Sequence, residues 1–205
     1  MRAPVAAGTG KTAVVARCPL PDAKLANRDA ILEAARDVFA KLGYGAKTIR
    51  DIIRATDLAS GTFYNYFKSK EEVFQAIQDE NALRVRPRLR AERIRALNVE
   101  EFISGTFRTF FDYVATDQKT FAAIRRNTDT MRIRMDTPEV IAGFEELRED
   151  IVAAIEHGLL PPLDADFLMA AMVGVAFEVV ERMLRRETVD SDAAADFAAK
   201  LFLGG

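Results

Sequence analysis

The chain has 205 residues, of which 49% are hydrophobic and 29% charged, and its formal net charge is −2. This composition is that of an ordinary folded protein, and no apolar run reaches the ~18 to 20 residues that cross a bilayer. The N-terminus also lacks the apolar core of a secretory signal, so we expect a cytoplasmic protein with no membrane partner. One cysteine, Cys18, and one histidine, His157, are too few for a disulfide or a Cys/His zinc site. We expect no metal and no cofactor.

Charge is distributed unevenly along the chain. Residues 1–26 are basic and lack hydrophobic periodicity, which predicts a flexible arm. Residues 81–95 carry a net charge of +5, whereas residues 96–205 carry −9. This asymmetry fits a half that faces DNA and an acidic remainder. The arginines of residues 84–95 could contact phosphates, but the solvated face of a connector is the favoured interpretation.

Helical spacing of apolar residues begins at Asn27 and predicts a first helix that ends at Gly43. Thr48 can cap a short second helix, with Asp51 in the capping-box position. A third helix is expected over residues 60–67. Ser69 then caps a fourth helix, with Glu72 three residues on, and we expect Pro87 to end or kink it.

The rest of the chain also has helical periodicity. Apolar stripes predict helices within residues 103–114, 121–131 and 140–155, then over residues 164–186 and 192–202, the last capped by Ser191. No period-2 pattern typical of strands occurs. We therefore predict an all-α protein of about nine helices. It comprises a helix-turn-helix DNA-binding domain over residues 27–85 and a helical domain for effector binding and dimerisation over residues 86–205.

Two short helices joined by a tight turn can place the second helix in the major groove of DNA. Phe63 and Phe67 lie four residues apart on that helix and can pack inward, which turns small, polar and aromatic side chains outward. Such groups suit base edges and phosphates, and residues near helix N-termini suit phosphates. The predicted DNA-binding residues are Thr48, Arg50, Ser60, Gly61, Thr62, Tyr64, Asn65, Tyr66 and Lys70.

Residues 28–74, and above all TIRDIIRATDLASGTFYNYFKSKEEVF at 48–74, resemble the TetR family of transcriptional regulators. The resemblance implies groove or phosphate contacts by all the residues just named except Asn65. The turn departs from the usual Gly-Val-Ser pattern and reads Asp57-Leu58-Ala59. Asp tolerates a left-handed turn less easily than Gly, and Ala cannot cap the third helix.

The resemblance also implies a homodimer whose last two helices form a four-helix bundle, with a ligand cavity enclosed by the preceding helices. Residues 167–180 are apolar around the whole helix, which predicts one side on the chain's own core and another on a partner. Small side chains would permit close approach. The predicted interface residues are Ala171, Gly174, Val175, Ala195 and Ala199.

Aromatic and methionine side chains are candidates for the wall of a cavity for a hydrophobic small molecule, although such stripes are more often plain core. The candidates are Phe107, Phe110, Phe111, Phe121, Met131, Met135, Phe144 and Phe177. Residues 125–127 could hold an anionic headgroup, but a solvated helix face is favoured. The string GTGKT at 8–12 resembles the end of a phosphate-binding loop, but the first glycine and the preceding strand of such a loop are missing. Nucleotide binding is therefore not favoured.

Together these patterns predict a regulator that is not an enzyme. We expect a homodimeric repressor that binds a pseudo-palindromic double-stranded operator and is released by a small-molecule ligand. The alternatives are a helical enzyme, for which no Ser-His-Asp, metal or paired-carboxylate arrangement is found, and a helical adaptor that has lost DNA binding through the changes at Asp57 and Ala59.

Overall fold

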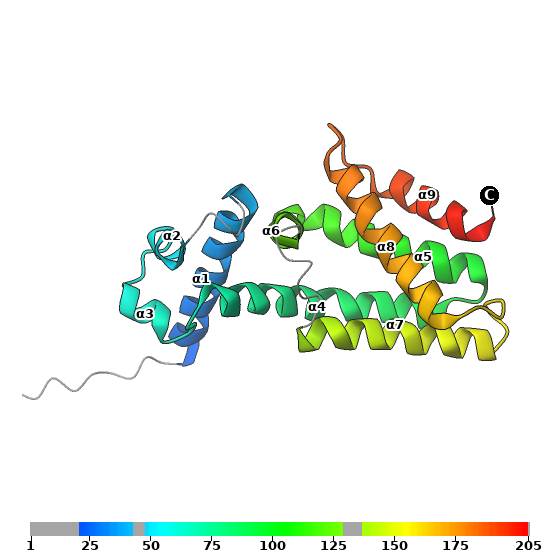
Figure 1. The fold of residues 1–205 in the computed structure, drawn as a ribbon, viewed down its shortest axis with the longest axis horizontal. Coiled ribbons are helices and arrows are strands. Elements are labelled where there is room, and N and C mark those ends of the chain that lie inside the picture. The colour runs from blue at the N-terminus through cyan, green and yellow to red at the C-terminus, as the bar shows by residue number, and fades with distance from the viewer. Residues whose placement is uncertain (1–20, 43–47, 129–136, 205) are drawn as a thin grey trace, which may run out of the picture.

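The computed structural model of the chain describes residues 21–42, 48–128 and 137–204. Within these ranges the chain forms nine α-helices and no strand, which confirms the all-α prediction. In Figure 1 a small group of helices is joined through one long helix to a larger bundle. The helices are α1 (Pro21–Leu42), α2 (Ile49–Arg54), α3 (Ser60–Tyr64), α4 (Lys70–Arg95), α5 (Val99–Thr116), α6 (Gln118–Thr128), α7 (Pro138–Glu156), α8 (Ala165–Leu184) and α9 (Ser191–Leu203).

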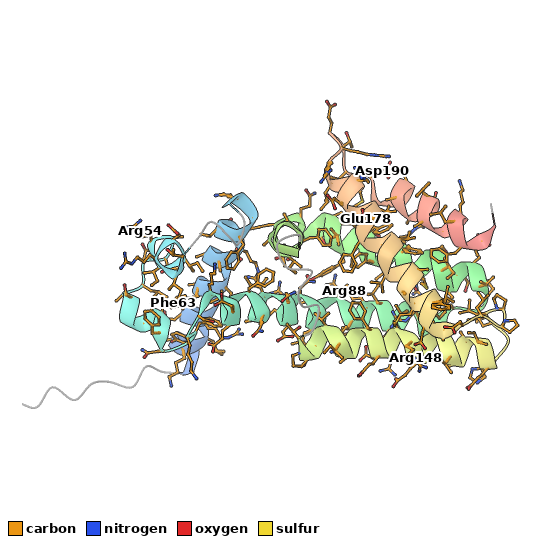
Figure 2. All side chains as sticks on the ribbon, in the orientation of Figure 1. Arg54, Phe63, Arg88, Arg148, Glu178 and Asp190 are labelled. Carbon is orange, nitrogen blue, oxygen red and sulfur yellow. The ribbon has the colours of Figure 1, made fainter. Side chains whose placement is uncertain are left out.

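The small group, which we call the head, comprises α1, α2, α3 and residues 70–80 of α4. Its core is a hydrophobic cluster to which each of these helices contributes a fully buried side chain. The largest of these side chains are Ile31 and Phe39 of α1, Ile52 of α2, Phe63 of α3 and Ile77 of α4 (Figure 2). Because α2 and α3 are too short to be stable alone, this shared core holds them in place.

The predicted caps of α2 and α4 are confirmed. The Asp51 carboxylate accepts hydrogen bonds from the Thr48 backbone N–H at 2.9 Å and from its hydroxyl at 3.1 Å. Ser69 Oγ accepts from the Glu72 backbone N–H at 3.2 Å. By contrast, α3 starts after Ala59, which supplies no side-chain cap, and it ends at Tyr64 rather than Phe67. Both the missing cap and an internal glycine destabilise such a helix.

Two other helix starts differ from the predictions. Helix α1 begins at Pro21 and not at Asn27, so residues 21–26 of the predicted arm are helical. Proline favours the first position of a helix because an N–H there would have no intrahelical partner. Helix α9 is capped by Asp190 instead of Ser191, since the Asp190 carboxylate accepts from the Ala193 N–H at 2.9 Å. Residues 1–20, with the GTGKT string, lie outside the described residues.

Pro87 was expected to end or kink α4; the helix does not end there and continues to Arg95. A proline inside a helix removes one hydrogen bond and costs about 3 kcal/mol. Packing on both sides of Pro87 offsets this cost, because Val85 and Leu89 join the core of the larger bundle and Arg93 is buried against α7. The predicted domain boundary after residue 85 therefore falls inside one continuous helix.

Helix α5 lies at the centre of the larger bundle and packs against α4, α8 and α9. Its inward face carries Phe102, Phe107 and Phe111, each at most 2% exposed. Between them and α8 and α9 lie small or flexible side chains such as Met172 and Ala198. Within the described ranges, none of the helices combines the length and hydrophobicity that a bilayer-spanning segment needs.

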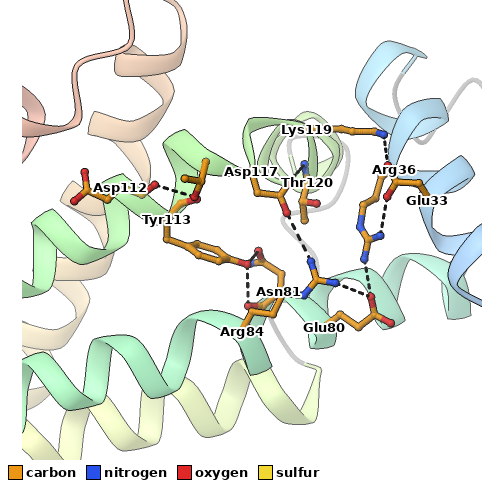
Figure 3. A network of polar contacts seen from close by, with 11 residues as sticks. Glu33, Arg36, Glu80, Asn81, Arg84, Asp112, Tyr113, Asp117, Lys119 and Thr120 are labelled. Atoms are coloured by element: carbon orange, nitrogen blue, oxygen red, sulfur yellow. Dashed lines mark hydrogen bonds and ion pairs between the residues drawn. The ribbon is translucent and has the colours of Figure 1, made fainter.

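Helix α6 joins the bundle to the head. Its residues Ala123 and Ile124 are buried in the hydrophobic core of the head, although they follow α5 in the chain. At its first turn, Lys119 pairs with Glu33 of α1 (Figure 3). Lys119 Nζ also lies 2.8 Å from Asp37 Oδ1 of the same helix. The head is therefore packed on α6 as well as on its own helices.

Glu80 on α4 is the centre of a second set of ion pairs at this junction (Figure 3). Its two carboxylate oxygens lie 2.6 Å from Arg28 Nη1 and 2.6 Å from Arg36 Nη2 on α1. Arg84, one turn further along α4, lies 3.8 Å from both Glu80 and Asp117. These contacts link α1, α4 and the start of α6.

The head core generates a stability prediction. Phe39→Ala should lower the free energy of unfolding by about 3 to 5 kcal/mol, because it removes a fully buried ring that also packs edge-on against Phe74. Urea denaturation followed by circular dichroism measures this. Leu97→Ala, at a side chain that is 83% exposed, is the control and should change the value by less than about 0.5 kcal/mol. Equal losses in the two variants would contradict the assignment of this core.

Candidate nucleic-acid interface and ligand cavity

Helix α3 presents a polar and aromatic face to solvent. Phe63 and Phe67 hold it on the head, with 1% and 5% of their surfaces exposed, as the four-residue spacing predicts. Tyr64 is 56% exposed, and its ring meets Phe63 edge-on at 5.5 Å between centroids. Ser60 and Asn65 are also exposed. Aromatic packing beneath the helix thus fixes which residues face outward.

Gly61 lies on this outward face. A Cβ atom built at Gly61 would have no protein atom within 4 Å, so internal packing does not require glycine there. The absence of a side chain leaves the backbone of α3 open to a close approach from outside. This is the role that the sequence predicts for Gly61 toward DNA.

The remaining predicted DNA-binding residues flank α3. Thr48 and Arg50 are exposed at the start of α2, and Lys70 is half-buried at the start of α4. Thr62 and Tyr66 are half-buried, and the Tyr66 hydroxyl accepts a 3.4 Å hydrogen bond from Asn27 Nδ2 on α1. All nine predicted residues therefore lie on the head, around one short helix.

A second feature is a cavity of about 150 Å³ in the bundle, with a wall built mainly from apolar side chains of α4 to α8. Five of the eight predicted residues line it: Phe107, Phe110, Phe121, Phe144 and Phe177. Three of these rings contact one another, with Phe121 stacked on Phe177 at 6.1 Å and Phe110 meeting Phe177 edge-on at 5.9 Å.

Three predictions for the cavity wall do not hold or fall outside what can be described. Phe111 is fully buried behind the wall, in contact with the rings of Phe107 and Phe110, and does not line the cavity. It lies one position past Phe110 on α5 and so points to another side of the helix. Met131 and Met135 lie outside the described residues, as do the side chains of residues 125–127.

The sequence analysis missed the polar residues of the cavity wall. Gln78, Asn81, Arg86 and Arg93 of α4 and Tyr113 of α5 all line it. Arg86 and Arg93 were missed because residues 84–95 were interpreted as a solvated connector, an explanation that does not extend to Gln78 and Asn81. Tyr113 could have been found, because it lies three residues after Phe110 and thus on the same face of α5.

Arginines of α4 pair with acids of α7 along one wall. Arg86 pairs with Glu139, and its Nη2 lies 2.5 Å from Glu146 Oε1. Arg93 is almost fully buried and its Nε lies 2.7 Å from Asp150 Oδ2. Burial lowers the pKa of Arg93 and the bond to Asp150 opposes this, but a guanidinium stays charged in proteins. This wall of the cavity therefore consists of ion pairs between α4 and α7.

The residues predicted to form the dimer interface lie on α8 and α9. Ala171 and Gly174 are exposed and Val175 is half-buried on α8. Ala195 and Ala199, however, are 1% and 5% exposed and belong to the bundle core, so they cannot contact a partner directly. Their small side chains let α9 approach α5 of the same chain.

Large apolar side chains are also exposed on these two helices. Phe167 is 77% exposed, while Phe197 and Leu201 of α9 are 56% and 57% exposed. Single exposed apolar side chains are common on protein surfaces, but several that cluster mark an interaction surface.

The chain resembles known regulatory proteins over both parts. Residues 31–77 match the sequence model of the family described as bacterial regulatory proteins, tetR family. The HTH-type transcriptional repressor AcnR of Corynebacterium efficiens is 29% identical over 139 residues, which cover 57% of this chain and 74% of that protein.

Solved structures extend the resemblance to most of the chain. The fatty acid degradation regulator FadR from Bacillus halodurans superposes with a TM-score of 0.76 at 26% identity, covering 92% of this chain and 98% of that one. FadR from Bacillus subtilis in complex with stearoyl-CoA gives a TM-score of 0.75 at 21% identity, with 86% and 98% covered.

The paired wall of the cavity generates a prediction on pH. The hydrogen bond from Arg86 lowers the pKa of the Glu146 carboxyl, although partial burial acts in the opposite direction. A lowered pKa means that Glu146 stabilises the fold above the unfolded-state value, about 4.3, and that this contribution is lost as the pH falls through the folded-state value.

Glu146→Gln should therefore lower the free energy of unfolding at neutral pH, with an effect that shrinks as the pH falls below about 4. Urea denaturation over a pH series measures this. The control is Glu145→Gln at the exposed neighbouring carboxylate. If both variants show the same pH profile, the Arg86 pair does not stabilise the fold.

Proposed function

The chain belongs to the TetR family of DNA-binding transcriptional regulators, and from this premise we propose that it is a homodimeric repressor released from its operator by a small-molecule ligand. The observation that carries the proposal is the exposed face of α3, where packed phenylalanines lie beneath an open glycine and polar side chains. We propose two functional domains. Residues 27–85 bind DNA, and residues 86–205 bind the effector and form the dimer. Its proposed activity is regulatory and not enzymatic.

In the proposed complex, α3 lies in the major groove. Ser60, Thr62 and Asn65 can donate to or accept from base edges and phosphates, and Tyr64 reaches a phosphate or a thymine methyl group. Gly61 lets the backbone come close to the DNA. Tyr66, held by Asn27, would contact the backbone at the margin of the helix.

The flanking residues are proposed to fix the position of α3. Thr48 and Lys70 lie at the N-terminal ends of α2 and α4, where the helix dipole and backbone N–H groups favour a phosphate. Arg50 extends from the first turn of α2 and can reach a guanine edge or a phosphate. These contacts would set the register in which α3 reads bases.

For the dimer, we propose that the exposed parts of α8 and α9 pack on the same surface of a second copy. Ala171, Gly174 and Val175 remain in the proposed interface, and Phe197 and Leu201 replace the buried alanines of α9. A two-fold dimer presents two copies of α3 to successive major grooves, about 34 to 36 Å apart. This geometry requires a pseudo-palindromic operator.

The proposed effector binds in the apolar cavity. A wall of phenylalanines and aliphatic side chains fits a largely hydrophobic molecule, and the similar B. subtilis protein was solved with stearoyl-CoA. Ile124 lines the cavity and is also buried in the head core, so a ligand that moves α6 also acts on the head. Release follows only if the ligand prefers a conformation with the wrong spacing of the heads.

Selection of bound sequences from random DNA duplexes by the purified protein tests this function. We expect enrichment of a pseudo-palindrome whose half-site centres lie about 10 base pairs apart or a multiple of it, with affinity that falls steeply as salt rises. A folded dimer that enriches no sequence would overturn the proposal and favour an adaptor without DNA binding.

Variants of the flanking residues give a sharper prediction. Arg50→Ala should weaken operator binding by about 1 to 3 kcal/mol, and Lys70→Ala should reduce the slope of log affinity against log salt by about 1 for each protomer. Titrations of labelled operator at several salt concentrations measure both.

Arg148→Ala is the matched control, because Arg148 is exposed on α7 at the opposite end of the molecule from α3 (Figure 2). It should leave affinity and salt slope unchanged. A loss as large as that of Arg50→Ala would show that the measurement reports net charge and not the proposed contact.

Gly174→Arg tests the dimer. A Cβ at Gly174 meets no atom of the same chain within 4 Å, so the single chain accommodates the new side chain, whereas a packed partner would clash with it. We expect light scattering to show that the variant is a folded monomer. Titration of labelled operator should show that its binding is weakened. Leu97→Arg, at an exposed site outside the α8 and α9 face, should remain dimeric. A dimeric Gly174→Arg protein would place the interface elsewhere.

A further inference from the structure

One corner of the cavity is polar. Gln78 and Asn81 of α4, Tyr113 of α5 and Asp117 at the end of α5 line it, and we call them the polar corner. They lie on the side of the cavity nearer the head, next to the Glu80 and Arg84 ion pairs (Figure 3). Phenylalanines also line the cavity, and its arginines are paired with acids of α7, so this corner offers a bound molecule uncharged hydrogen-bonding groups.

The hydrogen bonds of the polar corner leave room for an uncharged oxygen. Tyr113 is 7% exposed, and its hydroxyl donates to Asn81 Oδ1 at 2.8 Å. In the described part of the chain, the Nδ2–H group of Asn81 makes no hydrogen bond. The Tyr113 oxygen can still accept one. A ligand hydroxyl can use both groups, and a carbonyl can accept from Asn81.

The charges around the cavity disfavour an anion. In the described part of the chain, four ionised side chains line it, and the two cations among them, Arg86 and Arg93, are already paired with acids of α7. Asp117 places a negative charge at the polar corner. Burial and then Asp117, which lies 3.8 Å from Arg84, raise the pKa of Tyr113, while Arg84, Arg88 and Arg36 lower it. Among the described residues that line the cavity, each arginine already has an acidic partner, so a carboxylate here would lose its hydration without gaining an unpaired lining cation.

We propose that the effector is an uncharged amphiphile, an inference that rests on the ligand response proposed above. Its apolar part lies among the phenylalanines, and one neutral hydroxyl or carbonyl oxygen binds Asn81 and Tyr113. Asp117 is the residue that rejects carboxylates. The site thus distinguishes an alcohol or carbonyl compound from the fatty acid of the same chain length.

Calorimetric titration of the purified full chain with two probes of equal length, decanol and decanoate, tests this at neutral pH. We expect decanol to bind at least about tenfold more tightly, because an unpaired buried charge is costly. Tyr113→Phe should weaken decanol binding by about fivefold, the loss of one hydrogen bond. Asp117→Asn, which keeps the acceptor for the Thr120 N–H, should strengthen decanoate binding.

Thr116→Val is the matched control, since it removes a hydroxyl from the exposed side of α5 next to the corner. It should change neither affinity. Decanoate binding as tightly as decanol, or a lack of response to both Tyr113→Phe and Asp117→Asn, would overturn the inference, and so would the failure of both probes to bind. The operator selection is independent of these titrations: its success with failed titrations removes this inference alone, and its failure removes the proposed function.

Discussion

The fold depends on one constraint, which is that α4 belongs to two hydrophobic cores at once. Its first turns carry Ile77 in the head core, and Val85 further on lies in the bundle core. One continuous helix therefore takes part in the packing of both the head and the larger bundle. The ion pairs of Glu80 with α1 lie between the two cores and complete this connection.

Local signals made the head largely predictable. The caps at Thr48 and Ser69 and the spacing of Phe63 and Phe67 depend on neighbours within one turn, so the sequence states them directly. The same spacing predicts which side chains of α3 face solvent, and their contact with DNA stays a prediction. The length of α3 was not predictable in this way, because a helix without a side-chain cap ends where packing stops supporting it.

Features set by distant contacts were not predictable. The continuation of α4 through Pro87 depends on α5 and α7, which pack on both sides of it. Ala195 and Ala199 were assigned to a partner because a sequence of small residues does not say which helix approaches. The arginines of the cavity wall were not predictable, because a sequence does not show that their acidic partners lie on α7. Without those partners, arginines are expected to face solvent.

The insertion of Ala123 and Ile124 into the head core has a consequence for protein engineering. The head does not carry all of its own interior, so the segment that ends at α4 is not a self-sufficient module. Cut free there, it would expose the apolar surface that α6 covers, a surface prone to aggregation. A chimera that joins this head to the sensor of another regulator therefore needs α6 of this chain, or side chains of the same shape in its place.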